Sequence, residues 1–562
     1  MTTEIHKPAS TGAVRSPHLF LITTAILALV LSTLPYVIGY VGTPSGEYLW
    51  AGTSPSDFGV YLAWMRAAAD GSLRDPHLFA GGHPGMLINP VYLAMGIVSR
   101  LPGLTGAFVY HVSRIAFGAL LLYVLWRFVR LCSPDTLVRR LAFLFLCFSS
   151  GFGWCLGWLP LKYWSIDRWQ PEAFTFLSLY SYPHFCVALI LQVSILGLLV
   201  KAVSTERWPY ALAAGVCGCL LAIIHTYDII TVACIWFVYA LAQGFVRLGD
   251  SAQRARSWSM GIIAGLLTAP GIAYIYMAMR SDRVFAARIA EPTLSAPLYT
   301  VLIGYGGVLL LAIVGTRRLF GSQPDAQPRT TAFGLLPIWA IINLAVSYFP
   351  VIFQRKMLQG EHVALCVLAA VGAAYWLRRR FPDLDWGRLR WPEVALTAFL
   401  SVGSLVYLYH DTRDILAGVE QGRYRSTLTA PEVDALAWVR KNTPPGAVVQ
   451  PVPFVDKRMK LSAGLDNTVA LFTPGLTGRA VYAGHWAETP DFDQRIADVQ
   501  RLTRPSTIPK DTVAALDASG IAYFIYSETS AGAAPAVPVY MRLVYANQGA
   551  AVYMVDRRTL TN

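Results

Sequence analysis

Eleven long apolar runs constrain the fold of this chain more than any other feature of its sequence. A helix needs about 20 mostly apolar residues to cross the hydrocarbon core of a bilayer. Charged residues make up only 14% of the chain, against about 25% in a soluble domain. We therefore predict a mainly α, polytopic transmembrane helix bundle within residues 1–410. The predicted spans are 19–41, 105–126, 141–160, 178–200, 209–225, 228–246, 258–279, 296–315, 331–350, 361–377 and 393–410.

The basic residues between these runs predict how the bundle is oriented. With the N-terminus placed in the cytoplasm, the inside segments carry 19 Lys and Arg residues and the outside loops carry 10. Short connections such as 127–140 and 378–390 show the strongest bias, and the positive-inside rule works best in short loops. The net charge of +13 therefore needs no nucleic-acid partner. We predict a multi-pass protein of the plasma (cell inner) membrane, in contact with membrane lipids, with a cytoplasmic N-terminus.

Residues 411–562 are more polar, and eleven spans place them on the extracytoplasmic side. Pro431–Asn442 has the apolar spacing of a helix, and a Thr-Pro-Pro-Gly segment closes it. The end of the chain is typical of a hairpin that turns at Asn547-Gln548-Gly549. We predict an extracytoplasmic α/β domain here, with strands at 447–452, 480–484 and 521–527.

Polar side chains gather at the predicted outer ends of the spans. The first outer loop, 42–104, holds Asp57 before an amphipathic run, where it is either a helix cap or a functional acid. Arg114 lies in the outer half of the second span. An ionised group at that depth faces the bundle interior or a wet cavity unless it snorkels to the headgroups. We predict a polar cavity at the outer face. The residues that converge there are Asp57, His83, His184, His225, Asp228, Arg355, Lys356 and Glu361.

A cavity with one carboxylate and several cations suits a substrate that carries a phosphate. Arg355 can hold a phosphate through two parallel hydrogen bonds, and Lys356 adds a compact positive charge. Asp57 can accept a proton from an acceptor hydroxyl or amine near neutral pH. Transporters also collect charges at membrane depth, so these residues alone leave transfer and transport open.

The first loop resembles that of the GT-C glycosyltransferases. An Asp soon after the first span, a Tyr four residues later, a small-residue helix ending in Gly and a His-Pro segment carry the resemblance, as Asp57, Tyr61, Gly71 and His83-Pro84. The segment ALAWVRKNTPPGAVV in the tail is also similar to many bacterial members. Protein O-mannosyltransferases, the lipid A aminoarabinose transferase and mycobacterial arabinosyltransferases share this plan of spans, long outer loop and outer α/β tail.

The resemblance implies an inverting glycosyltransferase, a hexosyl- or pentosyltransferase that uses a polyprenyl-phosphate sugar donor. It implies that Asp57 activates a glycan, lipid or protein acceptor, and that Tyr61 lies in the same site. Arg355-Lys356 stands where basic residues meet the donor phosphate. His83 stands where several relatives carry a Lys near the donor.

The chain also departs from this family. Many relatives have an acidic pair where this chain has Asp57-Phe58, and the second outer loop offers only Asp167 and Glu172. We therefore expect no cofactor, and these residues do not support a divalent metal ion. Asp491-Phe492-Asp493 resembles a nucleotide-sugar motif but is interpreted as a solvated turn in the tail.

Two other functions stay open at this point. A transporter or flippase of a polyprenyl-linked lipid would bind the headgroup with the same cations, although the chain lacks two related halves. A non-catalytic subunit would keep the fold and lose the activity. In the tail, Tyr482, His485 and Trp486 are polar-aromatic residues that either contact sugar or pack ordinarily.

Overall fold

The structure is a computed structural model, and it is mostly helical. It describes residues 17–52, 54–156, 162–245, 251–320, 331–417, 426–452, 468–505, 510–527 and 536–560. Eleven helices correspond to the predicted spans: α1 (Pro17–Gly42), α4 (Gly106–Cys132), α5 (Thr136–Phe148), α7 (Pro183–Thr205), α8 (Trp208–Ile224), α9 (Thr226–Phe245), α10 (Ser251–Ser281), α12 (Leu298–Phe320), α13 (Thr331–Val346), α14 (Glu361–Arg380) and α15 (Trp391–Ala417).

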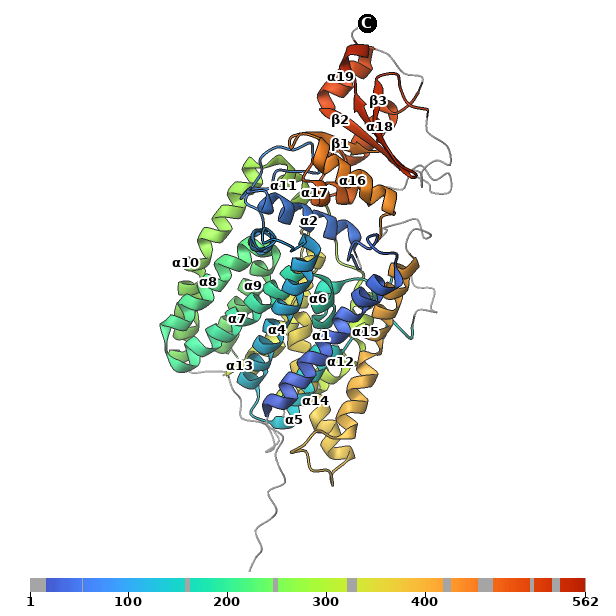
Figure 1. Cartoon of the computed structure of the whole chain (residues 1–562). Coiled ribbons are helices and arrows are strands. Elements are labelled where there is room, and N and C mark those ends of the chain that lie inside the picture. Colours follow the sequence, from blue (N-terminus) through green and yellow to red (C-terminus); the bar gives the residue numbers. More distant parts are fainter. Residues whose placement is uncertain are drawn as a thin grey trace, which may run out of the picture.

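Eight helices in the described ranges are long and apolar enough to cross a membrane. The apolar helices α8 and α13 are shorter, and α5 has only 13 residues. Together these helices form the polytopic transmembrane bundle that the apolar runs predict, drawn below the C-terminal part in Figure 1.

The third predicted span, 141–160, is wrong over its second half. Helix α5 ends at Phe148, and the amide of Ser149 makes its last helical hydrogen bond, to the carbonyl of Phe145. The amide of Ser150 donates to the carbonyl of Leu400 at 2.8 Å, and the amide of Phe152 donates to that of Ile303 at 3.0 Å. Residues 157–160 of this prediction lie outside the described ranges.

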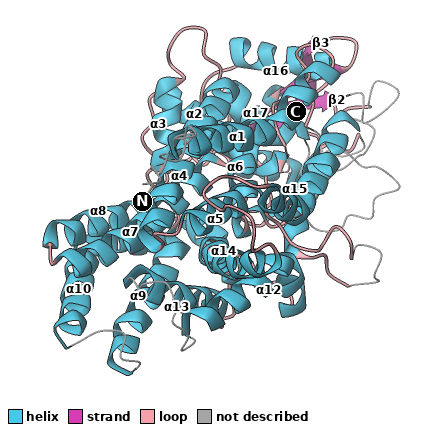
Figure 2. Ribbon diagram, turned by 90° about the horizontal axis from the view of Figure 1, so that it is seen from below, coloured by secondary structure: helices cyan, strands magenta, loops and turns pink. Residues whose placement is uncertain are grey.

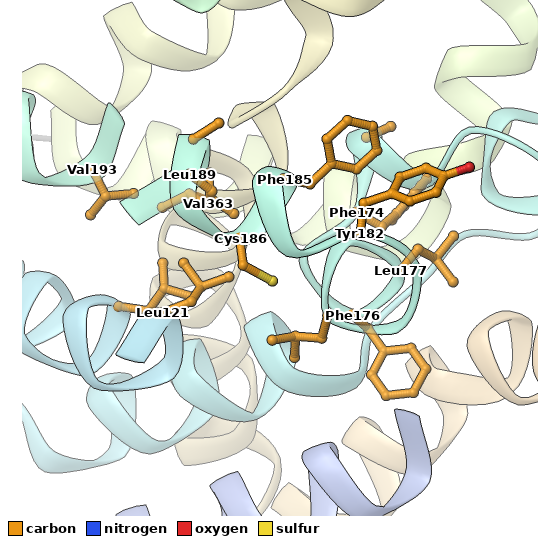
Figure 3. Packing of buried hydrophobic residues seen from close by; sticks show 14 of the residues in the cluster. Leu121, Phe174, Phe176, Leu177, Tyr182, Phe185, Cys186, Leu189, Val193 and Val363 are labelled. Carbon is orange, nitrogen blue, oxygen red and sulfur yellow. The ribbon is translucent and has the colours of Figure 1, made fainter. Parts of the chain in front are cut away.

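The bundle core is built from apolar side chains of helices distant in sequence. Figure 3 shows Phe185, Cys186 and Leu189 of α7 beside Leu121 of α4 and Val363 of α14. All five are buried, and close packing of this kind carries most of the stability of a helical core. The core therefore fixes the helix ends that carry the polar residues.

One end of the bundle carries short helices and the C-terminal part of the chain (Figure 1). The short elements are η1 (Ile166–Arg168), η2 (Pro171–Ala173), α2 (Pro55–Ala69), α3 (Pro90–Val98), α6 (Thr175–Ser181), α11 (Arg283–Ala290) and η3 (Gln354–Leu358). Helix α17 (Thr468–Thr477) packs on α2. A Cβ at Gly59 of α2 would lie 2.7 Å from the carbonyl oxygen of Leu471. This glycine therefore permits the close approach that joins the tail to the first loop.

The tail contains a small mixed sheet with strand order β1-β2-β4-β3. Strand β1 (Val448–Pro451) pairs parallel with β2 (Ile521–Ser527), and β4 (Ala550–Val555) pairs antiparallel with β2 and with β3 (Met541–Ala546). The tail helices are α16 (Ala430–Asn442), α17, α18 (Phe492–Leu502) and α19 (Lys510–Ser519), and η6 (Arg557–Leu560) ends the described chain. Figure 2 shows the strands at one margin of the molecule, away from α8, α9 and α10.

Most of the predicted tail elements are confirmed in position. The hairpin turns at Asn547–Gly549, where the Asn547 side chain accepts hydrogen bonds from the amides of Gly549 and Ala550. The strand predicted at 480–484 is wrong. Ala480 makes one isolated bridge with Val448, and the next amide, that of Val481, donates to the carbonyl of Leu78 in the first loop. This segment therefore serves as a junction between the tail and the loop.

Candidate active site

A cavity of about 520 Å³ lies where the first loop, the tail and the ends of several helices meet. Its walls come from α2 and the 75–92 segment, from the 169–185 region, and from the start of α9, α11, η3 and the 485–488 turn. The lining includes the predicted residues Asp57, Tyr61, His184, His225, Arg355 and Lys356. With Ile275 of α10, residues from eight separate chain segments face this one space.

Asp57 occupies the first turn of α2. Ser54 holds the N-cap position of this helix, so Asp57 is not its cap. The hydroxyls of Ser54 and Tyr182 both donate to Oδ2 of Asp57, at 2.9 Å and 3.0 Å. The Asp57 side chain is 45% exposed. One carboxylate oxygen is therefore held by two hydroxyls, while the group as a whole stays open to the cavity.

His485 faces this carboxylate from the tail. Its Nε2 lies 3.9 Å from Oδ1 of Asp57, and the imidazole is only 3% exposed. Its Nδ1 accepts a hydrogen bond from the amide of Ala487 at 3.2 Å. Burial lowers the pKa of His485, with Asp57 and Glu488 opposing that effect. The ring is therefore neutral near pH 7 and carries its proton on Nε2.

Aromatic and imidazole rings form the next part of the wall. The ring of Tyr61 stacks on that of Tyr92, with centroids 4.4 Å apart. The Tyr92 hydroxyl and Nδ1 of His184 are 2.7 Å apart, and the rings of His184 and His225 lie 6.0 Å apart. Such a wall combines flat apolar faces with a few fixed polar atoms, a combination typical of sites for small organic ligands.

Among the residues that the structure describes, three cations line the cavity, and they differ in how closely each is paired with a neighbouring side chain. Nη1 of Arg288 lies 2.9 Å from Oε1 of Glu488. Burial lowers the pKa of Arg288, but Glu488 outweighs it and the net change is upward. Nε of Arg355 lies 4.0 Å from Oε1 of Glu172, and Nζ of Lys356 lies 3.4 Å from the hydroxyl of Tyr227. Arg355 and Lys356 therefore retain donors for a bound anion.

The bundle itself holds the segment that carries Arg355 and Lys356. The carbonyl of Met357 accepts hydrogen bonds from Asn343 of α13, at 2.7 Å, and from Thr231 of α9, at 3.3 Å. One turn of 3₁₀-helix between two spanning helices is thus anchored from inside the bundle. This anchoring directs the two cations toward the cavity.

No family model matches the chain, and no curated protein matches its sequence. Solved structures do match in three dimensions. ArnT from Cupriavidus metallidurans, bound to undecaprenyl phosphate, superposes with a TM-score of 0.51 at 14% identity, over 96% of this chain and 98% of that one.

Two larger proteins also match. The archaeal oligosaccharyltransferase AglB from Archaeoglobus fulgidus, in complex with an inhibitory peptide and a dolichol-phosphate, gives a TM-score of 0.51 at 12% identity, over 91% of this chain and 69% of that one. The arabinofuranosyltransferase AftD from Mycobacteria gives 0.56 at 13% identity, over 96% of this chain but only 40% of that one. These neighbours are GT-C glycosyltransferases. The chain has the GT-C fold.

Within this GT-C fold, four of the predicted site residues lie outside the cavity lining. His83 is exposed, and its ring lies 4.9 Å from that of His77. Arg114 is fully buried and donates to the carbonyl of Leu179 at 2.8 Å and to the hydroxyl of Thr33 at 2.9 Å. Arg114 therefore ties α4 to α1 and α6.

Asp228 and Glu361 are the other two residues that do not line the cavity. Both are buried. Oδ2 of Asp228 lies 3.1 Å from Nδ1 of His225, so Asp228 backs a residue that does line it. Glu361 begins α14, directly after the turn at Gly360.

The cavity is more acidic than the sequence predicts. Among the described residues, five carboxylates line it, whereas only Asp57 of the three predicted carboxylates, Asp57, Asp228 and Glu361, does so. The carboxylates are those of Asp57, Asp75, Glu172, Glu291 and Glu488. Glu172 and Glu488 lie beside Arg355 and Arg288, so the surplus acids serve in part to hold the cations. Sequence reasoning missed Arg288 and Glu488 because they are 200 residues apart and meet only in three dimensions.

The second acid of many GT-C relatives has no counterpart beside Asp57. Phe58 is buried, and its ring packs edge-on against that of Tyr110 with centroids 4.7 Å apart. Within the described ranges, no group of three or more His, Cys, Asp and Glu side chains is placed to hold a metal ion. Asp167 accepts a hydrogen bond from the amide of Gly153 at 3.0 Å and does not line the cavity.

Proposed function

We propose that this protein transfers a sugar from a polyprenyl-phosphate donor to an acceptor, with inversion at the sugar. The single observation that carries the proposal is the setting of Asp57. It is a half-exposed carboxylate in a cavity, with one oxygen held by two hydroxyls and the other facing open space toward His485. A general base needs this combination of fixed geometry and access to the acceptor.

The cations on η3 supply the second part of the proposal. Arg355 and Lys356 have only long contacts to Glu172 and Tyr227, at 4.0 Å and 3.4 Å. A donor phosphate placed there would take charge-assisted hydrogen bonds from both. Two of the GT-C structures that superpose on this chain contain a polyprenyl phosphate, dolichol-phosphate in AglB and undecaprenyl phosphate in ArnT.

The proposed step is a direct displacement. The acceptor gives its proton to the carboxylate of Asp57, and its heteroatom forms a bond to the anomeric carbon. The bond from that carbon to the phosphate oxygen breaks, and polyprenyl phosphate leaves with the electron pair. Arg355 and Lys356 stabilise the negative charge that develops on the leaving phosphate. Attack from the face opposite to the phosphate inverts the anomeric configuration.

The proposal places the cavity on the extracytoplasmic side of the plasma membrane. The loop-charge count predicts this orientation, with the N-terminus in the cytoplasm. The cavity lies at the bundle end that carries the tail. The polyprenyl chain of the donor would stay in the bilayer while its sugar phosphate enters the cavity.

The experiment uses the purified full-length protein in detergent. A panel of polyprenyl-phosphate sugars is tested for thermal stabilisation and for release of polyprenyl phosphate. Arg355→Ala should weaken donor binding about 10- to 100-fold, because it removes a charge-assisted contact. Asp57→Asn should bind donor normally and fail to turn it over. Arg413→Ala, which removes an exposed Arg outside the cavity, is the matched control and should behave as the unmodified protein.

Turnover in detergent separates transfer from transport, because a flippase needs two compartments to show activity. Donor binding without turnover by the unmodified protein would favour a transporter or a non-catalytic subunit. Absence of donor binding by every member of the panel would remove the premise of a lipid phosphate.

A further inference from the structure

The turn that carries His485 is fixed at two points, to the first loop and to α11. The hydroxyl of Thr489 donates to the carbonyl of Phe79 at 2.7 Å, and it accepts from the amide of Gly484 at 3.3 Å. Glu488 pairs with Arg288 of α11 at 2.9 Å. His485 is therefore held against α2 by contacts that do not involve its own ring.

The imidazole of His485 has one nitrogen with a partner and one without. Nδ1 accepts from the amide of Ala487, which leaves the proton of the neutral ring on Nε2. That Nε2 is buried and has no hydrogen-bond partner in the described part of the chain. A buried donor without a partner costs about 1–3 kcal/mol, so such an atom in a cavity wall indicates a ligand that completes it.

The distance from Nε2 of His485 to Oδ1 of Asp57 points to the kind of group that fits. At 3.9 Å, the two atoms are too far apart for a good hydrogen bond. One oxygen atom at about 2.8 Å from each would bond to both, because such hydrogen bonds have that length. The bridging atom must accept a hydrogen bond from Nε2–H and donate one to the carboxylate.

We propose that the reacting hydroxyl of the acceptor lies between Oδ1 of Asp57 and Nε2 of His485, and that the acceptor is therefore an alcohol. This inference rests on the proposed function and names its acceptor class. A hydroxyl has one donor and two lone pairs, so it can bond to both atoms and still present a lone pair to the donor sugar. An amide nitrogen has no lone pair for Nε2–H, and an ammonium group accepts no hydrogen bond.

His485 then acts as a specificity-determining residue at the reacting atom. The hydroxyl proton goes to Asp57, the hydroxyl oxygen forms the bond to the anomeric carbon, and polyprenyl phosphate leaves. His485 keeps its own proton throughout and only orients the oxygen. Burial lowers the pKa of this imidazole and keeps the ring neutral near pH 7. The ring must be neutral because Nδ1 has to be unprotonated to accept the hydrogen bond from the amide of Ala487.

The test uses the full-length protein with a polyprenyl-phosphate sugar that the panel identifies. Three acceptor probes are compared: water, read as donor hydrolysis, n-octyl glucoside, and octanamide. Fully O-methylated octyl glucoside, which lacks hydroxyls, is the negative control. We expect product from octyl glucoside and slow hydrolysis by water, and none from octanamide.

Two variants separate the role of Nε2 from simple packing. His485→Leu removes the donor, and kcat/KM for octyl glucoside and the hydrolysis rate should each fall about 10- to 100-fold, the loss expected for one hydrogen bond to the reacting group. His485→Gln keeps an N–H near the same place and should recover most of that loss. Both variants should bind donor as the unmodified protein does.

Three results would overturn the inference: His485→Leu with unchanged kcat/KM, equal rates for the Leu and Gln variants, or glycosylated octanamide. Each of these requires a protein that binds and turns over the donor, so each leaves the proposed function intact. Loss of donor binding or of turnover in the unmodified protein would instead contradict the proposed function itself.

Discussion

Two histidine–aspartate sites in the same part of this molecule differ in whether the side chains touch and in how exposed the carboxylate is. In the first, His77 has Nε2 2.9 Å from Oδ2 of Asp282 and Nδ1 3.5 Å from Oδ2 of Asp75. All three side chains are less than a tenth exposed. In the second, His485 and Asp57 are 3.9 Å apart and Asp57 is 45% exposed. We call the His77 site the closed site, because its side chains are in direct contact. We call the His485 site the open site, because the gap between its two side chains has room for one atom.

The closed site joins two segments that are far apart in sequence. Asp282 precedes α11, whose N-cap it provides by accepting from the amide of Phe285 at 3.0 Å. It also accepts from the amide of Met86 at 2.9 Å. This site therefore fixes α11, and with it Arg288, to the first loop. The direct contact of 2.9 Å between His77 and Asp282 supports the fold, whereas the separation of 3.9 Å between His485 and Asp57, beside a cavity, leaves room for a ligand atom.

The largest effect is expected from a substitution that disrupts the open site. Asp57→Asn keeps the shape of the side chain and removes the base, so transfer should fall about 10²- to 10⁴-fold. The free energy of unfolding should change little, because the side chain is half-exposed. Radiolabelled sugar transfer and a denaturant titration of the same preparation measure both quantities. Activity near that of the unmodified protein would contradict the assignment of the base.

The second prediction concerns a substitution that disrupts the closed site. Asp282→Ala leaves His77 and two backbone amides without their acceptor. Breaking a buried pair in this way costs about 3–5 kcal/mol, which a guanidinium titration in detergent should detect. Asp414→Ala is the matched control, because Asp414 forms an exposed pair with Arg413 and should shift the midpoint negligibly. Equal shifts in the two variants would mean that the His77 site does not hold the fold.

A third prediction sharpens the description of the open site. Ser54→Ala and Tyr182→Phe each remove one hydroxyl from Oδ2 of Asp57. Each change should lower kcat about 10-fold, since a hydrogen bond to a charged group is worth about 1.5–3 kcal/mol. Donor binding should be unaffected. Variants that lose donor affinity instead of kcat would place these hydroxyls on the substrate and not on the base.

The sequence predicts the helices well because membrane spans depend on local composition. Its error at 141–160 has a tertiary cause, because the amides of Ser150 and Phe152 bond to carbonyls of α15 and α12, and a count of apolar residues cannot predict these contacts. The strand predicted at 480–484 has the right composition. It fails because the amide of Val481 bonds to the first loop and not to a neighbouring strand.

The site was harder to predict than the helices. Asp57 is predicted from its place before an amphipathic run in the long first outer loop and from the resemblance of that loop to the GT-C glycosyltransferases. Arg355-Lys356 is predicted because both residues lie in a short loop between two apolar runs. The pairing of Arg288 with Glu488 depends on how α11 packs against the tail, and the spacing of apolar residues in the sequence does not predict that packing. Arg114 shows the opposite problem. Its burial in the outer half of the span is predicted, but its partners are carbonyls and hydroxyls of α1 and α6 and not a ligand.

The smallest expected effect is a difference between the two sites in how the stability of the protein changes with pH. Burial alone would lower the pKa of His77, but Asp75 and Asp282 outweigh it and raise the pKa. The protonated pair therefore adds stability that is fully present below the unfolded pKa of about 6.5 and is lost as pH rises through the folded pKa. Burial lowers the pKa of His485, so stability at that site falls as pH drops below about 6.5.

The two histidines should thus change stability with pH in opposite directions. His77 has a positive φ of 44°, a conformation that Asn tolerates, so Asn replaces each histidine in turn. The stability advantage of the unmodified protein over His77→Asn should shrink between pH 6 and pH 9. The advantage over His485→Asn should instead be larger at pH 7 than at pH 5. Parallel pH dependences in the two variants would mean that the two sites do not differ in charge state, and the contrast between a closed pair and an open one would then lose its electrostatic basis.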